Sequence, residues 1–124
     1  MDLTVEAIRL GMNMAQLRAE VASTNIANVH VAGYRAERAD FGAAMGLLRE
    51  AAADPDMAVD RLTELTPAVL RSSVNRADGE ADSSASLDGQ VAELESAGVD
   101  FQSLTTVLSR RFALMQLALT GRNG

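Results

Sequence analysis

The side chains that most often carry out chemistry are few in this chain, and their spacing fits no common catalytic or metal site. His30 is the only histidine and cysteine is absent, so no site with two imidazole or thiolate ligands can form. No serine lies in the Gly-x-Ser-x-Gly elbow of hydrolases, and no glycine-rich phosphate loop is present. We therefore expect no catalytic, cofactor-binding or metal-binding residue and no cofactor, and we interpret His30 as an ordinary loop residue.

Acidic residues in the middle of the chain invite a calcium interpretation that their spacing does not support. Placing Gly79 at the sixth position of an EF-hand loop puts Val74 and Arg76 at the first and third ligand positions, where oxygen ligands are required. We likewise interpret Asp54, Asp56 and Asp60 as solvated loop charges and not as metal ligands.

Length, composition and charge indicate a small helical interaction protein that is not an enzyme. The chain has 124 residues, of which 48% are hydrophobic but only three are phenylalanine and one is tyrosine. Such an alanine-rich composition forms helices readily and fills a thick core poorly. The net charge of −6 argues against nucleic-acid binding, which requires a basic surface. No cleaved signal peptide or membrane-spanning stretch is expected, so direct membrane insertion is not predicted.

Two apolar series with alternating spacings of three and four residues lie at opposite ends of the chain and predict two long helices. This 3.5-residue repeat is typical of helices that keep one seam facing a partner helix. The predicted assembly interface comprises, in the first series, Val5, Ile8, Met12, Ala15, Ala19, Ala22 and Ile26, and in the second, Leu87, Val91, Leu94, Phe101, Leu108, Phe112, Met115 and Leu119. Each helix carries a second apolar stripe, which indicates contacts with more than one neighbour.

The repeats and breaks divide the chain into four segments. An N-terminal assembly helix occupies 1–30, with Asp2 or Thr4 as its cap, and a turn and extended segment occupies 31–41. A variable, partly mobile middle covers 42–86, with a short helix from Gly42, a possible hairpin within Thr63–Val74 and a linker over Ser72–Ser86. The C-terminal assembly helix occupies 87–121. The predicted fold class is mainly α: the two long helices pack as an antiparallel coiled-coil-like pair, joined by an irregular middle with possible short β-structure.

The end of the first predicted helix contains polar residues that can stabilise the helix end and the turn after it. Asn25 and Asn28 can hydrogen-bond the backbone where the helix stops, Gly33 can take a positive φ in the following turn, and Tyr34 can cover that turn. The alternative to a functional role is that these residues simply cap the end of the helix. A positive φ at Gly33 is expected because Ala32-Gly33-Tyr34 has only one residue suited to it.

This element resembles the N-terminal signature of the flagellar basal-body rod protein family. Asn25, Ile26, Ala27, Asn28, Gly33 and Tyr34 match that signature position by position, while Val31-Ala32 replace its Thr-Pro pair. The C-terminal segments Leu87-Asp88, Phe101-Gln102-Ser103-Leu104 and Leu108-Ser109-Arg110-Arg111-Phe112 are similar to those of the family's proximal rod proteins. The resemblance covers roughly residues 1–41 and 86–121.

The resemblance implies a structural subunit that polymerises into the rod of the flagellar basal body. Its partners would be further copies, other rod proteins, and the basal-body adaptor, MS-ring and export-gate proteins. It would lie in the basal body across the periplasm, exported through the flagellar type III apparatus without a cleaved signal peptide. The alternative from another class is a cytosolic helical-hairpin adaptor or dimerisation protein unrelated to flagella.

Overall fold

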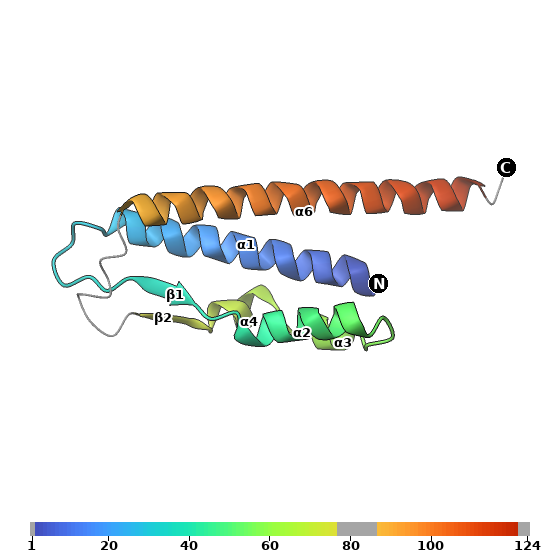
Figure 1. Cartoon of the computed structure of the whole chain (residues 1–124), viewed down its shortest axis with the longest axis horizontal. Helices are drawn as coiled ribbons and strands as arrows, with labels where there is room; N and C mark the ends of the chain where they lie inside the picture. The colour runs from blue at the N-terminus through green and yellow to red at the C-terminus, as the bar shows by residue number, and fades with distance from the viewer. Residues whose placement is uncertain (1, 77–86, 122–124) are drawn as a thin grey trace.

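The two long helices and the middle segment form three layers in the computed structural model, which describes residues 2–76 and 87–121. Helix α1 (Leu3–Ala27) is the central layer, with helix α6 (Leu87–Gly121) along one side and the middle segment along the other (Figure 1). The predicted mainly α fold, with two long terminal helices packed against each other, is confirmed.

Helix α1 begins and ends at residues suited to those places. The Asp2 carboxylate accepts hydrogen bonds from the amides of Thr4, at 2.7 Å, and Val5, at 3.4 Å, so Asp2 is the N-cap. At the other end, the side-chain amide of Asn28 donates a 2.8 Å hydrogen bond to the backbone carbonyl of Thr24. The helix therefore covers three residues fewer at its C-terminal end than the predicted segment 1–30, whose last residues form turns.

Helices α1 and α6 are antiparallel and differ in length. Asp2 at the beginning of α1 lies against Arg111 of α6, while Asn25 near its end lies against Gln90. Close approach midway is possible because Gly11 has no side chain: a Cβ there would lie 3.0 Å from Leu104. At about 1.5 Å per residue, α6 is about 15 Å longer than α1. Residues 112–121 therefore extend beyond the beginning of α1 (Figure 1), and we call them the α6 overhang.

The middle segment is more ordered than the sequence predicts. It contains helices α2 (Gly42–Ala53), α3 (Asp60–Thr63) and α4 (Pro67–Arg71), together with strands β1 (Glu37–Ala39) and β2 (Val74–Arg76). The predicted hairpin within Thr63–Val74 is wrong, because Thr66 caps α4 and Pro67 occupies its first turn. Instead β2 pairs with β1 in antiparallel register, Arg38 opposite Asn75.

The predicted linker is also partly wrong. Residues 72–76 form a turn and strand β2, whereas 77–86 lie outside the described residues. The extended stretch expected before Phe41 is present as β1, and the short helix expected from Gly42 is present as α2.

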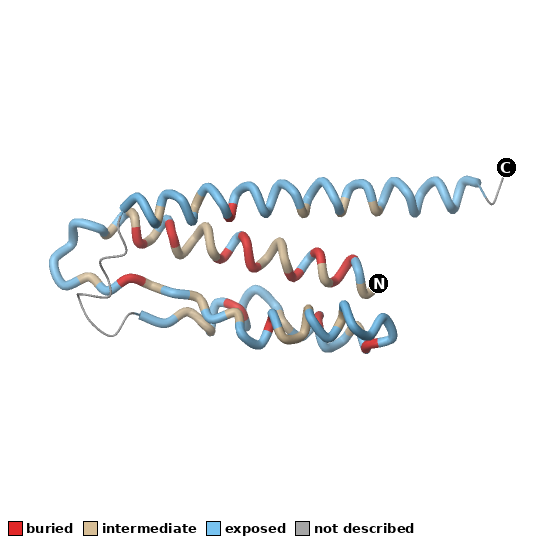
Figure 2. Tube along the Cα trace, viewed as in Figure 1, coloured by how far each residue is buried: buried red, intermediate tan, exposed pale blue. Residues whose placement is uncertain are grey.

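The hydrophobic core lies between α1 and the middle segment. The second apolar stripe of α1 contributes Leu10, Met14 and Leu17 to a buried cluster completed by Ala44, Met57, Leu62 and Leu70. Buried positions accordingly alternate along α1 and are sparse on α6 (Figure 2). The second apolar stripe of α1 therefore packs on the middle segment of the same chain.

Candidate assembly surface

Asn25 joins four parts of the chain at the end of α1. Its side-chain oxygen accepts hydrogen bonds of 2.8 Å from the Tyr34 hydroxyl and from the Glu37 amide. Its side-chain nitrogen donates to the Glu37 carbonyl at 3.0 Å and to the Gln90 side chain at 3.2 Å. The residue is buried, so these bonds satisfy a side chain that would otherwise be costly to bury. We call Asn25, Tyr34, Glu37 and Gln90 the Asn25 junction.

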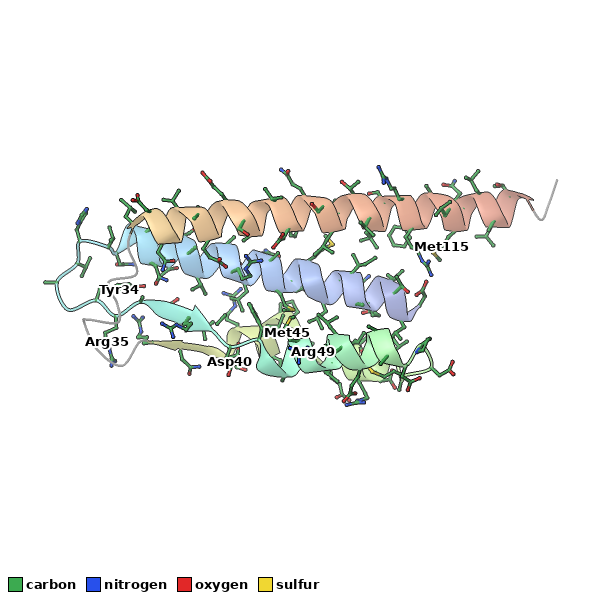
Figure 3. All side chains as sticks on the ribbon, viewed as in Figure 1. Tyr34, Arg35, Asp40, Met45, Arg49 and Met115 are labelled. Carbon is green, nitrogen blue, oxygen red and sulfur yellow. The ribbon has the colours of Figure 1, made fainter. Side chains whose placement is uncertain are left out.

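Tyr34 lies in the loop that follows α1 (Figure 3), and its hydroxyl closes the junction from that side. Burial raises the pKa of its phenol above the usual value, and the nearby Glu37 carboxylate acts in the same direction. The Arg76 guanidinium lies 5.6 Å from the ring centroid, within cation–π range. The tyrosine thus ties the loop to α1 and to strand β2.

The other motif residues shape the helix end rather than a binding pocket. Ile26 and Asn28 are half-buried, and Ala27 is the last residue of α1 and exposed. Gly33 has a φ of 77°, as the sequence predicts, and no other described residue has a positive φ. A Cβ is disfavoured in this left-handed conformation.

Replacement of Gly33 by alanine is expected to destabilise the fold by about 1 kcal/mol or more, because alanine must adopt a left-handed backbone conformation. The matched control is Ala32→Ser, at the neighbouring exposed position, which should be nearly neutral. Urea unfolding followed by circular dichroism measures both. Equal stabilities for the two variants would contradict the conclusion that the turn requires glycine at position 33.

Charged side chains hold α1 against α6 along the interface. Arg18 donates to Glu93 and to Asp100, each at 2.6 Å, and to the Ser96 hydroxyl at 3.3 Å. These hydrogen bonds raise the already high pKa of Arg18, first through Glu93 and then through Asp100. The pairs fix the rotation and register of α6, although partly exposed ion pairs contribute modestly to stability.

Arg111 contacts α1 at the residue just before the α6 overhang. It donates a 2.6 Å hydrogen bond to the Asp2 carboxylate, whose other oxygen caps α1. The pKa of Asp2 is lowered, mainly by the hydrogen bond from Arg111. Burial is the next largest effect and opposes this shift, and the Thr4 and Val5 amides lower the pKa further. The cap and the helix–helix contact therefore depend on the same charge.

The Asp2–Arg111 pair should make the stability of the α1–α6 contact depend on pH. A carboxyl group whose pKa is lowered in the folded state contributes stability above its unfolded pKa of about 3.9, and that contribution is lost as pH falls through the lowered value. Asn can still cap a helix, so Asp2→Asn removes the charge alone. We expect wild type to unfold at higher urea than Asp2→Asn at pH 7, and the two curves to converge as the pH falls below the lowered pKa of Asp2. A gap that persists in acid would contradict the assignment.

The seam predicted on α1 faces α6. Val5, Ile8, Ala15 and Ala22 are buried, and helix spacing places them opposite the stripe that enters the core. Met12, Ala19 and Ile26 are half-buried on the same face.

The seam predicted on α6 is only partly the one that packs on α1. Leu94 and Leu108 are half-buried, and Phe101 is 36% exposed. The other positions of this predicted assembly interface are exposed in the isolated chain: Leu87, Val91, Phe112, Met115 and Leu119. The packed face instead runs through Gln90, Ala97, Leu104 and Arg111, so α6 is rotated toward these residues.

The rotation leaves a large apolar surface uncovered on α6. Side chains of the α6 overhang are among the most exposed, with Leu114 63%, Leu117 67% and Leu119 62% accessible. Met115, just beyond the beginning of α1 (Figure 3), is 42% accessible. Contiguous exposed apolar surface of this kind marks an interaction site.

Other kinds of site have little support in the described part of the chain. Residues 2–76 and 87–121 contain no group of three or more His, Asp or Glu residues placed to hold a metal ion. None of the helices in these ranges combines the length and apolar character needed to cross a membrane. Comparison with known proteins finds no matching family model, curated protein or solved structure.

Proposed function

We propose that this chain is a structural subunit of the bacterial flagellar basal-body rod, of the proximal type, which polymerises with other rod proteins into the drive-shaft tube. The observation that carries the proposal is the α6 overhang, ten exposed residues (112–121) rich in leucine that have no α1 opposite them. A helix pair with one apolar end uncovered is suited to addition of further subunits.

The resemblance to the rod family gains support from how its motif residues are used. Asn25 and Tyr34 are hydrogen-bonded to each other, and Gly33 takes the positive φ that the turn between them requires. The junction also includes Gln90 of α6, so the motif fixes the relative position of the two terminal helices. A signature with that structural role fits a family defined by paired terminal helices.

On this proposal the protein lies in the basal body across the periplasm and reaches it through the flagellar export apparatus without cleavage. Its partners are other copies, the remaining rod proteins, and the adaptor, MS-ring and export-gate proteins at the base of the rod.

Deletion of the gene in its own bacterium tests the proposal. We expect non-swimming cells whose purified basal bodies retain the MS ring and lack a rod in electron micrographs, and restoration of both by the wild-type gene. Recovery of the tagged chain in purified basal bodies is the second measurement. Normal swimming and complete rods in the deletion strain would refute the proposal and leave a helical-hairpin adaptor as the better interpretation.

A further inference from the structure

Glu6 is a buried carboxylate whose hydrogen bonding is incomplete. It lies in the first turns of α1 and is only 4% accessible, and its Oε1 atom has no hydrogen-bond partner within the described residues. The nearest cation, Arg9, approaches Oε1 at 3.7 Å, beyond hydrogen-bond distance, and is itself half exposed. Burying a carboxylate in this way is unfavourable unless a donor completes it.

A cavity opens beside this carboxylate between α1 and the α3–α4 region. It measures about 260 Å³, and Glu6 is one of its lining residues. The rest of the lining is half apolar and half polar. The apolar residues are Leu10, Leu62, Leu65 and Pro67, and the polar residues are Arg9, Asn13, Thr63 and Thr66. Small-molecule sites are usually about 300–1,000 Å³. The Glu6 cavity is smaller, which suits a single inserted side chain that carries a positive charge on an apolar stem.

A side chain of that description lies on the uncovered face of α6. Arg110 makes no hydrogen bond or ion pair with any described residue. Helical spacing places it between Val107 and Leu114, with Leu117 one turn further, and these three are 49%, 63% and 67% accessible. We call Val107, Arg110, Leu114 and Leu117 the outer stripe. An unpaired arginine within an exposed apolar stripe is typical of an interface anchor.

We propose that the outer stripe of one copy packs against the α1, α3 and α4 surface of a second copy, with Arg110 entering the Glu6 cavity and donating to Glu6 Oε1. The guanidinium supplies the missing donor, its methylene stem contacts the leucines, and Leu114 and Leu117 cover the rim. Donor and acceptor surfaces differ, so the contact is heterologous and repeats without closing, as a rod requires. The proposal rests on the polymerising role above, but the contact can be measured with purified protein.

Disulfide trapping tests the contact directly, because the chain has no cysteine of its own. Leu114→Cys protein, which keeps Arg110 and carries its cysteine on the outer stripe, is mixed with a differently tagged Thr63→Cys protein, whose cysteine lies at the exposed edge of the Glu6 cavity, and oxidised. The matched control replaces Thr63→Cys by Val31→Cys, an exposed position beyond the other end of α1. We expect about tenfold more mixed dimer with Thr63→Cys than with the control, because docking raises the local thiol concentration. Equal yields would overturn the proposal.

Charge removal tests the pairing itself. Glu6→Gln keeps the side-chain shape, whereas Arg110→Gln removes the charge and shortens the side chain, and thermal unfolding of each monomer confirms that it is folded. Each should reduce mixed-dimer yield at a fixed concentration by about tenfold, and the double variant should be no weaker than either single variant. Independent losses that multiply in the double variant would refute the pairing. Efficient trapping from a chain whose deletion leaves rods intact would retain the contact and refute the rod function instead.

Discussion

Asn25→Ala is expected to lower the free energy of unfolding by about 2–4 kcal/mol, the largest single effect on stability that the structure predicts. The substitution removes four hydrogen bonds and leaves the Tyr34 hydroxyl, both backbone groups of Glu37 and the Gln90 side chain without their shared partner. Urea unfolding followed by circular dichroism measures the loss. Amide exchange should also become faster in β1 and at the beginning of α6, because the junction holds both to α1.

Two further variants separate the parts of the junction. Tyr34→Phe removes one hydrogen bond and keeps the ring, so it should cost about 1 kcal/mol. Asn25→Asp keeps the acceptor for Tyr34 and Glu37 but loses both donated bonds, and should be intermediate between Tyr34→Phe and Asn25→Ala. If Asn25→Ala were no more costly than Tyr34→Phe, Asn25 would be a local helix cap and would not join the elements.

The features that the sequence predicts well are those decided by neighbouring residues. The two helices follow from regular apolar spacing, the beginning of α1 from Asp2, and the positive φ from the only glycine in its turn. Asn25 and Tyr34 are also recognisable as candidates, because polar and aromatic residues at a helix end have few other purposes. The bond from Asn25 to Gln90 is not predictable, since it spans 65 positions.

The rotation of α6 depends on contacts that the apolar pattern does not contain. Leu94, Phe101 and Leu108 belong equally to two seams, one continuing through Val91 and one through Ala97. The structure uses the second, because small Ala97 is fully buried and because Arg18 then reaches both Glu93 and Asp100. The pattern of opposite charges on the two helices, rather than their hydrophobic pattern, would have predicted which face of α6 packs on α1.

Helices α3 and α4 of the middle segment are difficult to predict from the sequence because they are short. They have four and five residues, too few for a helical repeat to be recognised. Their order comes from burial of Leu62 and Leu70 against α1, which is a tertiary effect. The β-branched residues of the same region suggested strands, but the Thr66-Pro67 pair, a cap followed by a first-turn proline, was the stronger signal.

Met115→Asp is expected to abolish motility and rod assembly while leaving export of the chain intact. Met115 is 42% accessible in the isolated subunit, one turn beyond Arg111, so a carboxylate there remains hydrated and monomer stability should change by less than about 0.5 kcal/mol. In the proposed rod a neighbouring subunit covers this position, and the carboxylate would be desolvated without a partner. The effect should therefore appear only on assembly.

Matched variants on the same helix end separate position from charge. Gln116→Asp places the same carboxylate on the adjacent exposed residue, whose own side chain is already polar, and should leave swimming unchanged. Met115→Leu keeps the volume and apolar character and should also swim. Soft-agar swimming, secreted chain in the medium or periplasm, and basal bodies in electron micrographs are the measurements. Normal swimming by Met115→Asp would mean that Met115 faces water in the assembled state. The overhang would then have to assemble through the outer stripe, and Leu114→Asp would be the variant that tests this.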